Sequence, residues 1–388
     1  MHIIESIASK FQELFDKAPL IVRSPGRVNL IGEHTDYNQG LVLPAAINKN
    51  IFVAAGIRAD REIHLHSLDL GESYTGNLDN MTASGKLWPD YLLGVADQLV
   101  KHGHILQGFN IVFAGDIPQG AGLSSSAALE CATAFALNKL YALGLDKMAL
   151  AKTAQQAENE FVGVKCGLMD QFASTFGQNK SVIKLDCRSF EYEYIPFLAT
   201  DIKVVLLDTR VTHSLATSAY NERRAQCEKG VELIREHAGE VHSLRDATPA
   251  MLDEFVRPYD ELIFRRCSYV VSEIRRVEDA ATDLRNNDFE AFGKCMYASH
   301  DGLQHLYEVS CAELDVLVDL VRDDTLVLGA RMMGGGFGGC TINLVQSGHV
   351  DTLIERVSKN YFEQTGLELK AYVSEIAAGT AEETFMLV

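Results

Sequence analysis

The chain has 388 residues, of which 47% are hydrophobic and 23% charged, and its formal net charge is −18 at pH 7. This length predicts two domains, and the composition is typical of a soluble globular protein. The acidic balance argues against nucleic acid or an anionic membrane as the main partner. A site for a polyanion would therefore need local backbone amides, a few cations and a metal ion.

Targeting signals and metal motifs are not evident. The first residues carry neither the basic start nor the apolar core of a signal peptide, and no apolar run reaches the length of a membrane span. The eight cysteines are scattered without a C-x-x-C pair, which predicts free thiols in a reducing cytoplasm. His64 and His66 are expected on a solvent-facing strand rather than at a metal site.

The first stretch whose residues suggest a binding or catalytic site follows an amphipathic helix expected over residues 3–15. An apolar strand beginning at Ile21 is predicted to enter a turn at Pro25 and Gly26. A dense set of polar residues comes next: Arg27, Asn29, Glu33, His34, Thr35 and Asp36. One interpretation is a solvated turn. The other is an array of acceptors for the vicinal hydroxyls of a sugar, because neighbouring apolar residues would bury the polar groups and a buried arginine needs a partner.

Two strands, 51–53 and 63–66, are expected next. The single tryptophan, Trp88, precedes a helix-like stretch at 91–96. We interpret it as part of the core or of a pocket wall, although it could also stack on an aromatic base.

A glycine-rich loop at 115–128 lies between a predicted strand (109–113) and a predicted helix (127–140). This layout directs backbone N–H groups and the positive end of a helix dipole at one point, and three successive serines add hydroxyls. The loop therefore favours phosphate binding, although an ordinary helix entrance would look similar. It is not a Walker loop, because Ala121 occupies the position of the required lysine.

Asp170 follows a second predicted helix (153–161) and is flanked by Leu168, Met169 and Phe172. An unpaired carboxylate is costly among apolar residues. The position alone fits either a structural cap or a catalytic base whose charge a nearby cation stabilises.

The domain boundary is expected at residues 196–201, between strands predicted at 183–186 and 203–207. A polar turn at 208–213 and helical stretches over 215–320 follow. The charges of these helices stand at helix-pair spacing, as in Glu273 with Arg276, and most are expected on a solvated face.

Gly334, Gly336 and Gly339 match the dinucleotide fingerprint G-x-G-x-x-G, but the context is wrong. The fingerprint needs a helix directly after the glycines, whereas 340–345 alternates like a strand. The glycines instead suggest close packing against another loop or a ligand. A helix over 350–361 and a last strand over 369–373 are expected to close the chain.

Together, these motifs resemble the GHMP superfamily of small-molecule kinases. Residues 25–37 are similar to the signature of its galactose-specific branch, residues 118–128 to the phosphate loop, and Gly334 to Gly339 to the third motif. The likeness extends to residues 166–171 and 218–224. Ser24 departs from the alanine usual at its position.

The resemblance implies an α/β fold of two domains, with the active site in the cleft between them. An N-terminal domain (1–195) would contain a left-handed βαβ unit, and a C-terminal domain (196–388) would be ferredoxin-like, with the last strand possibly returning to the first domain. The implied reaction transfers the γ-phosphoryl group of ATP to the anomeric hydroxyl of α-D-galactose. The implied protein is a cytoplasmic monomer without nucleic-acid or membrane partners.

The resemblance also implies roles for individual residues. Asp170 would be the catalytic base and Arg27 would keep it ionised. Ser126 and Glu158 would bind Mg²⁺. Sugar would be held by Glu33, His34, Thr35, Asp36, Gly167 and Tyr220. ATP would be held by Gly120, Ala121, Gly122, Leu123, Ser124, Ser125, Ser126 and Trp88.

Two alternatives stay open at this point. A related kinase for N-acetylgalactosamine or arabinose would use the same machinery. A non-catalytic sensor of galactose and ATP is disfavoured by the complete run from Ser124 to Ala128 and by the presence of Asp170.

Overall fold

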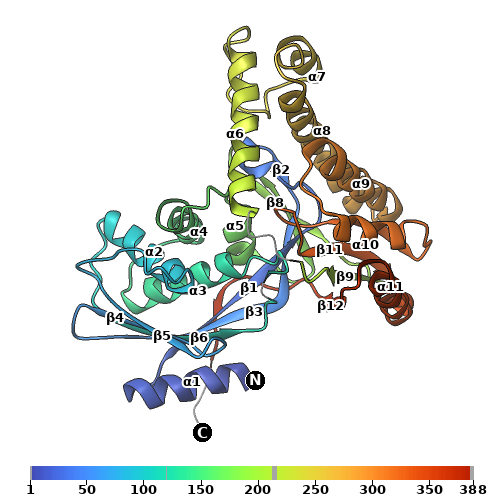
Figure 1. The fold of residues 1–388 in the computed structure, drawn as a ribbon. Helices are drawn as coiled ribbons and strands as arrows, with labels where there is room; N and C mark the ends of the chain where they lie inside the picture. The colour runs from blue at the N-terminus through green and yellow to red at the C-terminus, as the bar shows by residue number, and fades with distance from the viewer. Residues whose placement is uncertain (1, 119, 212–215, 385–388) are drawn as a thin grey trace.

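The computed structural model describes residues 2–118, 120–211 and 216–384, which form an α/β arrangement of three sheets with covering helices (Figure 1). The largest sheet has the order β13-β1-β3-β6-β4-β5. All of its neighbouring strands are antiparallel except β4 and β6. The strands are β1 (Leu20–Asn29), β3 (Pro44–Ile57), β4 (Glu62–Ser67), β5 (Glu72–Asn77), β6 (Phe109–Gly115) and β13 (Ala381–Glu382).

Strand alternation gives this sheet two apolar faces, so helices cover both sides. Ala54 and Val112 face α1 and pack with Ile7, while Val53 and Ile111 belong to the main core on the opposite face. Figure 1 shows α1 on one side of the sheet and α2 and α3 on the other. The helices of this half are α1 (His2–Phe15), α2 (Trp88–Lys101), α3 (Ser125–Leu140), α4 (Lys147–Gln156) and α5 (Met169–Phe176).

The second sheet is antiparallel with the order β10-β11-β9-β12. Its chain order, strand–helices–strand–strand–helix–strand, is that of the expected ferredoxin-like unit. α10 and α11 bury one face of it around Val205, Leu317 and Leu353. The strands are β9 (Ile202–Asp208), β10 (Val327–Met332), β11 (Cys340–Gln346) and β12 (Lys370–Ser374). The helices are α6 (Ala216–Arg235), α7 (Pro249–Met251), α8 (Glu261–Arg285), α9 (Phe289–Gly302), α10 (Ala312–Arg322) and α11 (Val350–Thr365).

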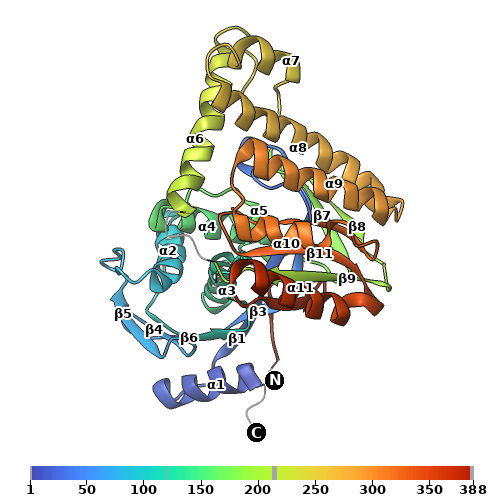
Figure 2. The same ribbon diagram turned by 45° about the vertical axis from the view of Figure 1, so that its right-hand side comes forward.

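Smaller elements complete the fold. The third sheet pairs β2 (Leu41–Val42), β7 (Ser181–Asp186) and β8 (Tyr192–Pro196). The 3₁₀ segments are η1 (Asp36–Asn38) and η5 (Ser347–His349), and the π-helical ones are η2 (Ala157–Val162), η3 (Leu252–Val256) and η4 (Leu303–Tyr307). In Figure 2, α6, α7 and α8 extend beyond the sheets at one end of the molecule.

The chain passes from one sheet to another between residues 196 and 202: β8, which ends at Pro196, belongs to the third sheet, and β9, which begins at Ile202, belongs to the second. A division into 1–195 and 196–388 remains our proposal. The predicted last strand, β12, pairs with β9 and stays in the second sheet. The shorter β13, which the sequence did not indicate, crosses back to pair with β1. Ser24 is buried against this returning segment, and its hydroxyl lies 2.8 Å from that of Thr380.

Three expectations need correction or restriction. Pro25 and Gly26 do not end the first strand, because β1 continues through them with a register shift between Pro25 and Arg27. Glu273 is not solvated: it is fully buried and accepts hydrogen bonds from the Gly32 amide (3.0 Å) and the Ser299 hydroxyl (2.6 Å). In the turn at 208–213, Thr212 and His213 lie outside the described residues.

The structure also bears on the cysteines, the histidines and membrane spans. All eight cysteines are free, and five of them are buried. His64 and His66 lie on β4, half-buried, within 2.8 Å of the Glu62 carboxylate and the Ser73 hydroxyl. Among the described helices, none has the length and apolar character needed to cross a membrane.

Candidate active site

The glycine-rich loop lies against the bulge of β1. Gly120 and Gly122 both have a φ of 73°, and Ser124 adopts the left-handed conformation (φ 57°) just before α3 begins. The Arg27 amide donates to the carbonyl of Leu123 (3.1 Å), and a Cβ on Gly26 would lie 2.6 Å from that oxygen. Only glycine therefore fits at position 26, and the loop is held close to Arg27.

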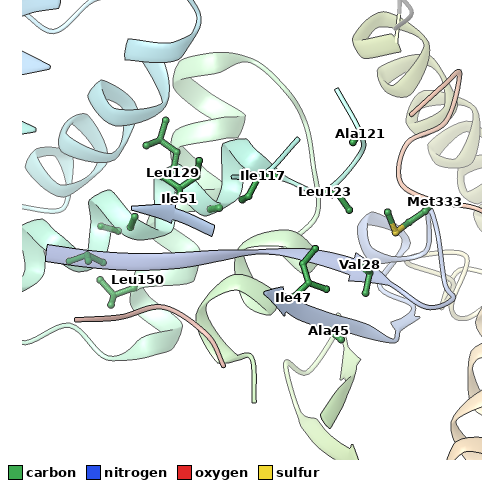
Figure 3. Packing of buried hydrophobic residues seen from close by; sticks show 14 of the residues in the cluster. Val28, Ala45, Ile47, Ile51, Ile117, Ala121, Leu123, Leu129, Leu150 and Met333 are labelled. Atoms are coloured by element: carbon green, nitrogen blue, oxygen red, sulfur yellow. The ribbon is translucent and has the colours of Figure 1, made fainter. Parts of the chain in front are cut away.

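Buried apolar residues anchor this junction. Ala121 and Leu123 of the loop belong to the main core together with Val28 of β1 and Met333. Figure 3 shows these four side chains around the same region, near the end of β1. Packing against the core thus fixes one side of the loop, and the loop serines lie on its other side.

Asp170 and Arg27 form a bidentate ion pair beside the loop. The Arg27 Nε and Nη2 atoms donate to the two carboxylate oxygens at 2.8 and 2.9 Å. Ser124 donates to Asp170 Oδ2 at 2.5 Å, and Arg27 Nη1 donates to the Gly122 carbonyl at 2.6 Å. Burial opposes the charge of Arg27, but the carboxylates of Asp170 and Glu33 outweigh it and raise the pKa of the guanidinium. The arrangement keeps Arg27 charged.

This pair lies at the wall of a cavity of about 280 Å³. Most residues expected from the sequence to hold a substrate line the same space. The lining residues are Arg27, Glu33, His34, Asp36, Glu158, Val164, Cys166, Met169, Asp170, Tyr220, Gly334, Gly335 and Gly336. The polar stretch after β1 and the glycines after β10 are far apart in the sequence, but they line the same cavity.

Glu33 joins those two segments. Its Oε1 accepts hydrogen bonds from Arg331 Nη2 (3.0 Å) and from the Gly334 amide (2.7 Å), and its Oε2 accepts from Asn29. Arg331 has no exposed surface and also donates to the carbonyls of Leu30 (2.8 Å), Met332 (2.7 Å) and Asn29. A buried charge network thus fixes the floor of the cavity.

His34 and Asp36 have opposite pKa shifts with the same first cause. Burial lowers the pKa of His34 to about 3, so the ring is neutral. Burial, together with the nearby Asp170 carboxylate, raises the pKa of Asp36 to about 7. Tyr220 on α6 completes this wall, with its ring centroid 5.3 Å from that of His34.

Thr35 and Gly167 do not line the cavity. The Thr35 hydroxyl is fully buried and donates to the carbonyls of Gly32 (2.9 Å) and Leu41 (2.6 Å), so it stabilises the turn. We therefore withdraw Thr35 from the expected substrate ligands. Gly167 acts indirectly, because a Cβ on it would overlap the Asp36 carboxylate.

Replacing Gly167 by alanine should displace Asp36 without touching the phosphate loop. We expect the KM for the sugar to rise about tenfold or more, since overpacking costs about 1–3 kcal/mol, while the KM for ATP stays unchanged. Steady-state kinetics test this. Gly239→Ala is the matched control, because nothing lies within 4 Å of a Cβ at that position. Equal kinetics in the two variants would show that Gly167 does not position Asp36.

Ser126 and Glu158, the predicted metal ligands, belong to a buried hydrogen-bond network that contains two carboxylates. Ser126 donates to Glu158 Oε1 (3.1 Å), and Glu158 Oε2 accepts from Gln171 (2.7 Å) and from the Cys166 thiol (3.3 Å). Gln171 also donates to Glu130 (3.1 Å), which is fully buried. Burial raises the pKa of both Glu158 and Glu130, and their mutual repulsion adds to the shift of Glu130.

A second hollow of about 530 Å³ lies beside the start of α3. Trp88 lines it together with Tyr91, Phe113, Ser125, Ser126 and Leu129, as the pocket-wall interpretation expected. The Trp88 Nε1 atom donates to Glu72 at 3.2 Å. Since Ser126 lines this hollow and Glu158 lines the cavity, their hydrogen bond marks the point where the two spaces meet.

The glycines after β10 pack closely, as expected. Gly334 faces Gly122 of the phosphate loop, and a Cβ on Gly336 would overlap the carbonyl of Val309. β11 begins at Cys340, directly after Gly339. The strand confirms that these glycines are not a dinucleotide fingerprint.

Arg331, Glu130 and Gln171 have site contacts that we did not predict. Arg331 had a visible signal, since it is the one charge in the run of apolar residues and glycines over 326–340, and a charge buried among such residues needs a partner. Glu130 and Gln171 lie on helix faces whose burial follows only from the packing of α3 against α5.

The fold and the cleft define a GHMP kinase. The chain matches the GHMP kinases N terminal domain over residues 90–178, the GHMP kinases C terminal over 280–363 and the galactokinase galactose-binding signature over 9–57. A mevalonate kinase from Methanococcus jannaschii shares the fold at 21% identity, with a TM-score of 0.65 over 92% of this chain and 98% of the other.

Relatives with higher sequence identity show which family within the GHMP kinases the chain belongs to. A galactokinase from Clostridium acetobutylicum is 40% identical over 98% of this chain and 99% of its own length. A galactokinase from Fusobacterium nucleatum is 38% identical over 98% and 100%. The crystal structure of Lactococcus lactis galactokinase complexed with galactose has a TM-score of 0.94 at 35% identity, covering 98% and 100%. The chain belongs to the galactokinase family.

Proposed function

We propose that the protein transfers the γ-phosphoryl group of ATP to the anomeric hydroxyl of α-D-galactose, giving galactose 1-phosphate and ADP. The observation that carries this proposal is the Arg27–Asp170 pair, which faces a cavity of sugar size next to a glycine-rich phosphate loop. The galactose bound by the Lactococcus lactis relative and the signature at residues 9–57 support galactose as the sugar.

In the proposed mechanism, the anomeric oxygen attacks the γ-phosphorus while the bond from that phosphorus to the leaving β-phosphate oxygen breaks. The proton of the hydroxyl passes to the Asp170 carboxylate. Arg27 stabilises both the ionised Asp170 and the charge of the transferring group, and the amides of Gly120 to Ser126 hold the phosphates.

Mg²⁺ would be held by Ser126 and Glu158. A hydroxyl and a carboxylate 3.1 Å apart are suitable oxygen donors for this hard ion, which keeps most of its ligands as water and phosphate oxygens. Within the described ranges, no three histidine, cysteine or carboxylate side chains converge on a metal site of their own. When bound, the ion would neutralise charge on the β- and γ-phosphates.

Four side chains would hold the sugar: Glu33, His34, Asp36 and Tyr220. Carboxylates accept hydroxyl hydrogens, and aromatic faces cover the apolar side of a sugar ring. Trp88 would contribute to the adenine pocket. The free cysteines support a reducing cytoplasmic location, and we propose a monomer as the active form.

Galactose affinity should fall as the pH falls below about 7, because burial raises the pKa of Asp36 to about 7. Sugar hydroxyls that donate to this carboxylate favour its ionised form, so binding releases a proton. Below this pKa, the dissociation constant should rise by up to about tenfold per pH unit. Calorimetric titration of galactose without ATP measures this. Asp36→Asn should bind weakly at every pH, and a flat profile for the unmodified chain would contradict the role of Asp36.

ATP consumption by the purified protein with Mg²⁺ tests the proposed function. Galactose, glucose, N-acetylgalactosamine and arabinose are compared in parallel. Turnover largely confined to galactose is expected. Turnover with another sugar would keep the kinase but overturn the interpretation of the sugar-binding residues. Tight galactose binding without turnover would instead favour the sensor.

A further inference from the structure

His34 is buried at the cavity wall, and only one of its two ring nitrogens makes a well-formed hydrogen bond within the described residues. It is 4% exposed, and Nδ1 lies 2.8 Å from the hydroxyl of Tyr37. Its Nε2 is buried and makes no well-formed hydrogen bond with the described residues, although the Gly335 backbone acts on the ring. The residue lines the cavity, so a group in the cavity can supply the missing partner.

A chain of hydrogen bonds extends from Nδ1 into the other half of the molecule. The Tyr37 hydroxyl lies 2.7 Å from that of Tyr307, at the end of η4. The Tyr307 hydroxyl lies 3.2 Å from the thiol of Cys227 on α6. Tyr307 and Cys227 are buried and Tyr37 is partly buried, and none of the three lines the cavity.

The hydrogens of this chain can run in two directions. In the first, the thiol donates to Tyr307, Tyr307 donates to Tyr37, and Tyr37 donates to Nδ1 of His34. In the second, Nδ1 donates to Tyr37 and the chain ends with Tyr307 donating to sulfur, which is a weak acceptor. A thiol is a weak donor as well as a weak acceptor, so the sulfur end does not decide the direction, which is set at the histidine ring.

The ring environment favours the first direction. The ring is neutral, so one nitrogen carries the hydrogen and the other accepts. The backbone of Gly335, beside the cavity, hydrogen-bonds with the ring and so raises the pKa of His34, as expected where a ring N–H donates. With Nδ1 accepting from Tyr37, that hydrogen is on Nε2.

We propose that Tyr37, backed by Tyr307 and Cys227, is a positioning residue that fixes His34 in the Nε2–H form. His34 then donates to an oxygen of the sugar, whereas Glu33 and Asp36 accept from its hydroxyls. The role toward the sugar rests on the proposed function. The hydrogen position does not, since it belongs to the protein without any ligand.

Nitrogen NMR of the full chain, labelled at histidine and free of sugar and ATP, tests the hydrogen position. The signals of His34 are those missing from the spectrum of His34→Gln. We expect a protonated Nε2 and an unprotonated Nδ1 at about pH 7. A hydrogen on Nδ1, or a doubly protonated ring, would overturn the proposal whatever the substrate is.

Two substitutions extend the test. Tyr37→Phe removes the donor to Nδ1, so the His34 signals should shift toward a mixture of forms and the dissociation constant for galactose should rise about tenfold. Tyr307→Phe leaves the Tyr37–His34 hydrogen bond in place and should have a smaller effect. Tyr361→Phe is the control, because its buried hydroxyl donates to the Thr209 carbonyl (3.0 Å) and Tyr361 does not line the cavity.

The kinetic pattern separates positioning from a merely structural role. Tyr37→Phe should raise the KM for galactose while kcat and the KM for ATP stay within about twofold. An unchanged His34 spectrum in Tyr37→Phe, or the same kinetic loss in Tyr361→Phe, would refute the positioning role. If Tyr37→Phe does not fold, the spectrum of the unmodified chain still decides the hydrogen position.

Discussion

Replacing Asp170 by asparagine should lower kcat by about 10³-fold or more while ATP binding changes little, because a general base contributes about 10²- to 10⁴-fold. Asparagine has the same shape and can still accept from Arg27, but it cannot take the proton of the hydroxyl. Single-turnover kinetics and a nucleotide titration measure the two quantities separately.

Two controls make the Asp170 result specific. Ser124→Ala removes one hydrogen bond to the carboxylate and leaves the base in place, so a much smaller loss is expected. Glu130→Gln changes a buried carboxyl that does not line the cavity. An equal loss of ATP binding and turnover in Asp170→Asn would mark Asp170 as the structural cap that its position alone also permitted.

Replacing Arg331 by leucine should strongly destabilise the protein. It leaves the buried Glu33 carboxylate short of its counter-charge and three backbone carbonyls without this donor. Breaking a buried ion pair by removing one partner costs about 3–5 kcal/mol. Urea unfolding measures the loss of unfolding free energy.

The control for Arg331 is an exposed arginine–glutamate pair. Arg285 lies 2.7 Å from Glu193, with both side chains at least 36% exposed, and such pairs contribute about 0–1 kcal/mol. The double variant Arg331→Leu with Glu33→Gln should recover part of the loss, because it removes the uncompensated charge. Similar losses in Arg331→Leu and Arg285→Leu would show that the network does not stabilise the fold.

The sequence revealed the site because its chemistry is concentrated in short segments. Arg27, Glu33, His34 and Asp36 lie within ten residues, and all four line the cavity. The strand, the glycine loop and the helix around Ser124 were readable from periodicity and glycine positions. The ferredoxin-like half followed from the resemblance rather than from local patterns.

The parts that escaped prediction depend on contacts between distant segments. Thr35 looked like a ligand because its neighbours share the polar stretch that lines the cavity, yet its hydroxyl turns toward the Gly32 and Leu41 carbonyls. Glu273 looked like a surface charge on α8, but it is buried and accepts hydrogen bonds from the Gly32 amide and the Ser299 hydroxyl. No local pattern in one segment records which backbone groups another segment will present to it.

The two halves of the site depend on each other through such contacts. Glu33 accepts a hydrogen bond from Gly334 across the cleft, and Tyr37 hydrogen-bonds Tyr307, which in turn contacts Cys227. The cavity therefore takes its shape from both halves of the chain, and a change in the C-terminal half can alter sugar binding without touching Asp170.

Phosphorus NMR of the product from galactose and ATP tests the central claim most directly. If Asp170 and the loop direct the γ-phosphoryl group to the anomeric oxygen, the new phosphate signal must couple to the anomeric hydrogen of the α form. We expect this signal to accumulate in step with ADP. A phosphate on another hydroxyl, or free phosphate in place of a sugar phosphate, would contradict the account.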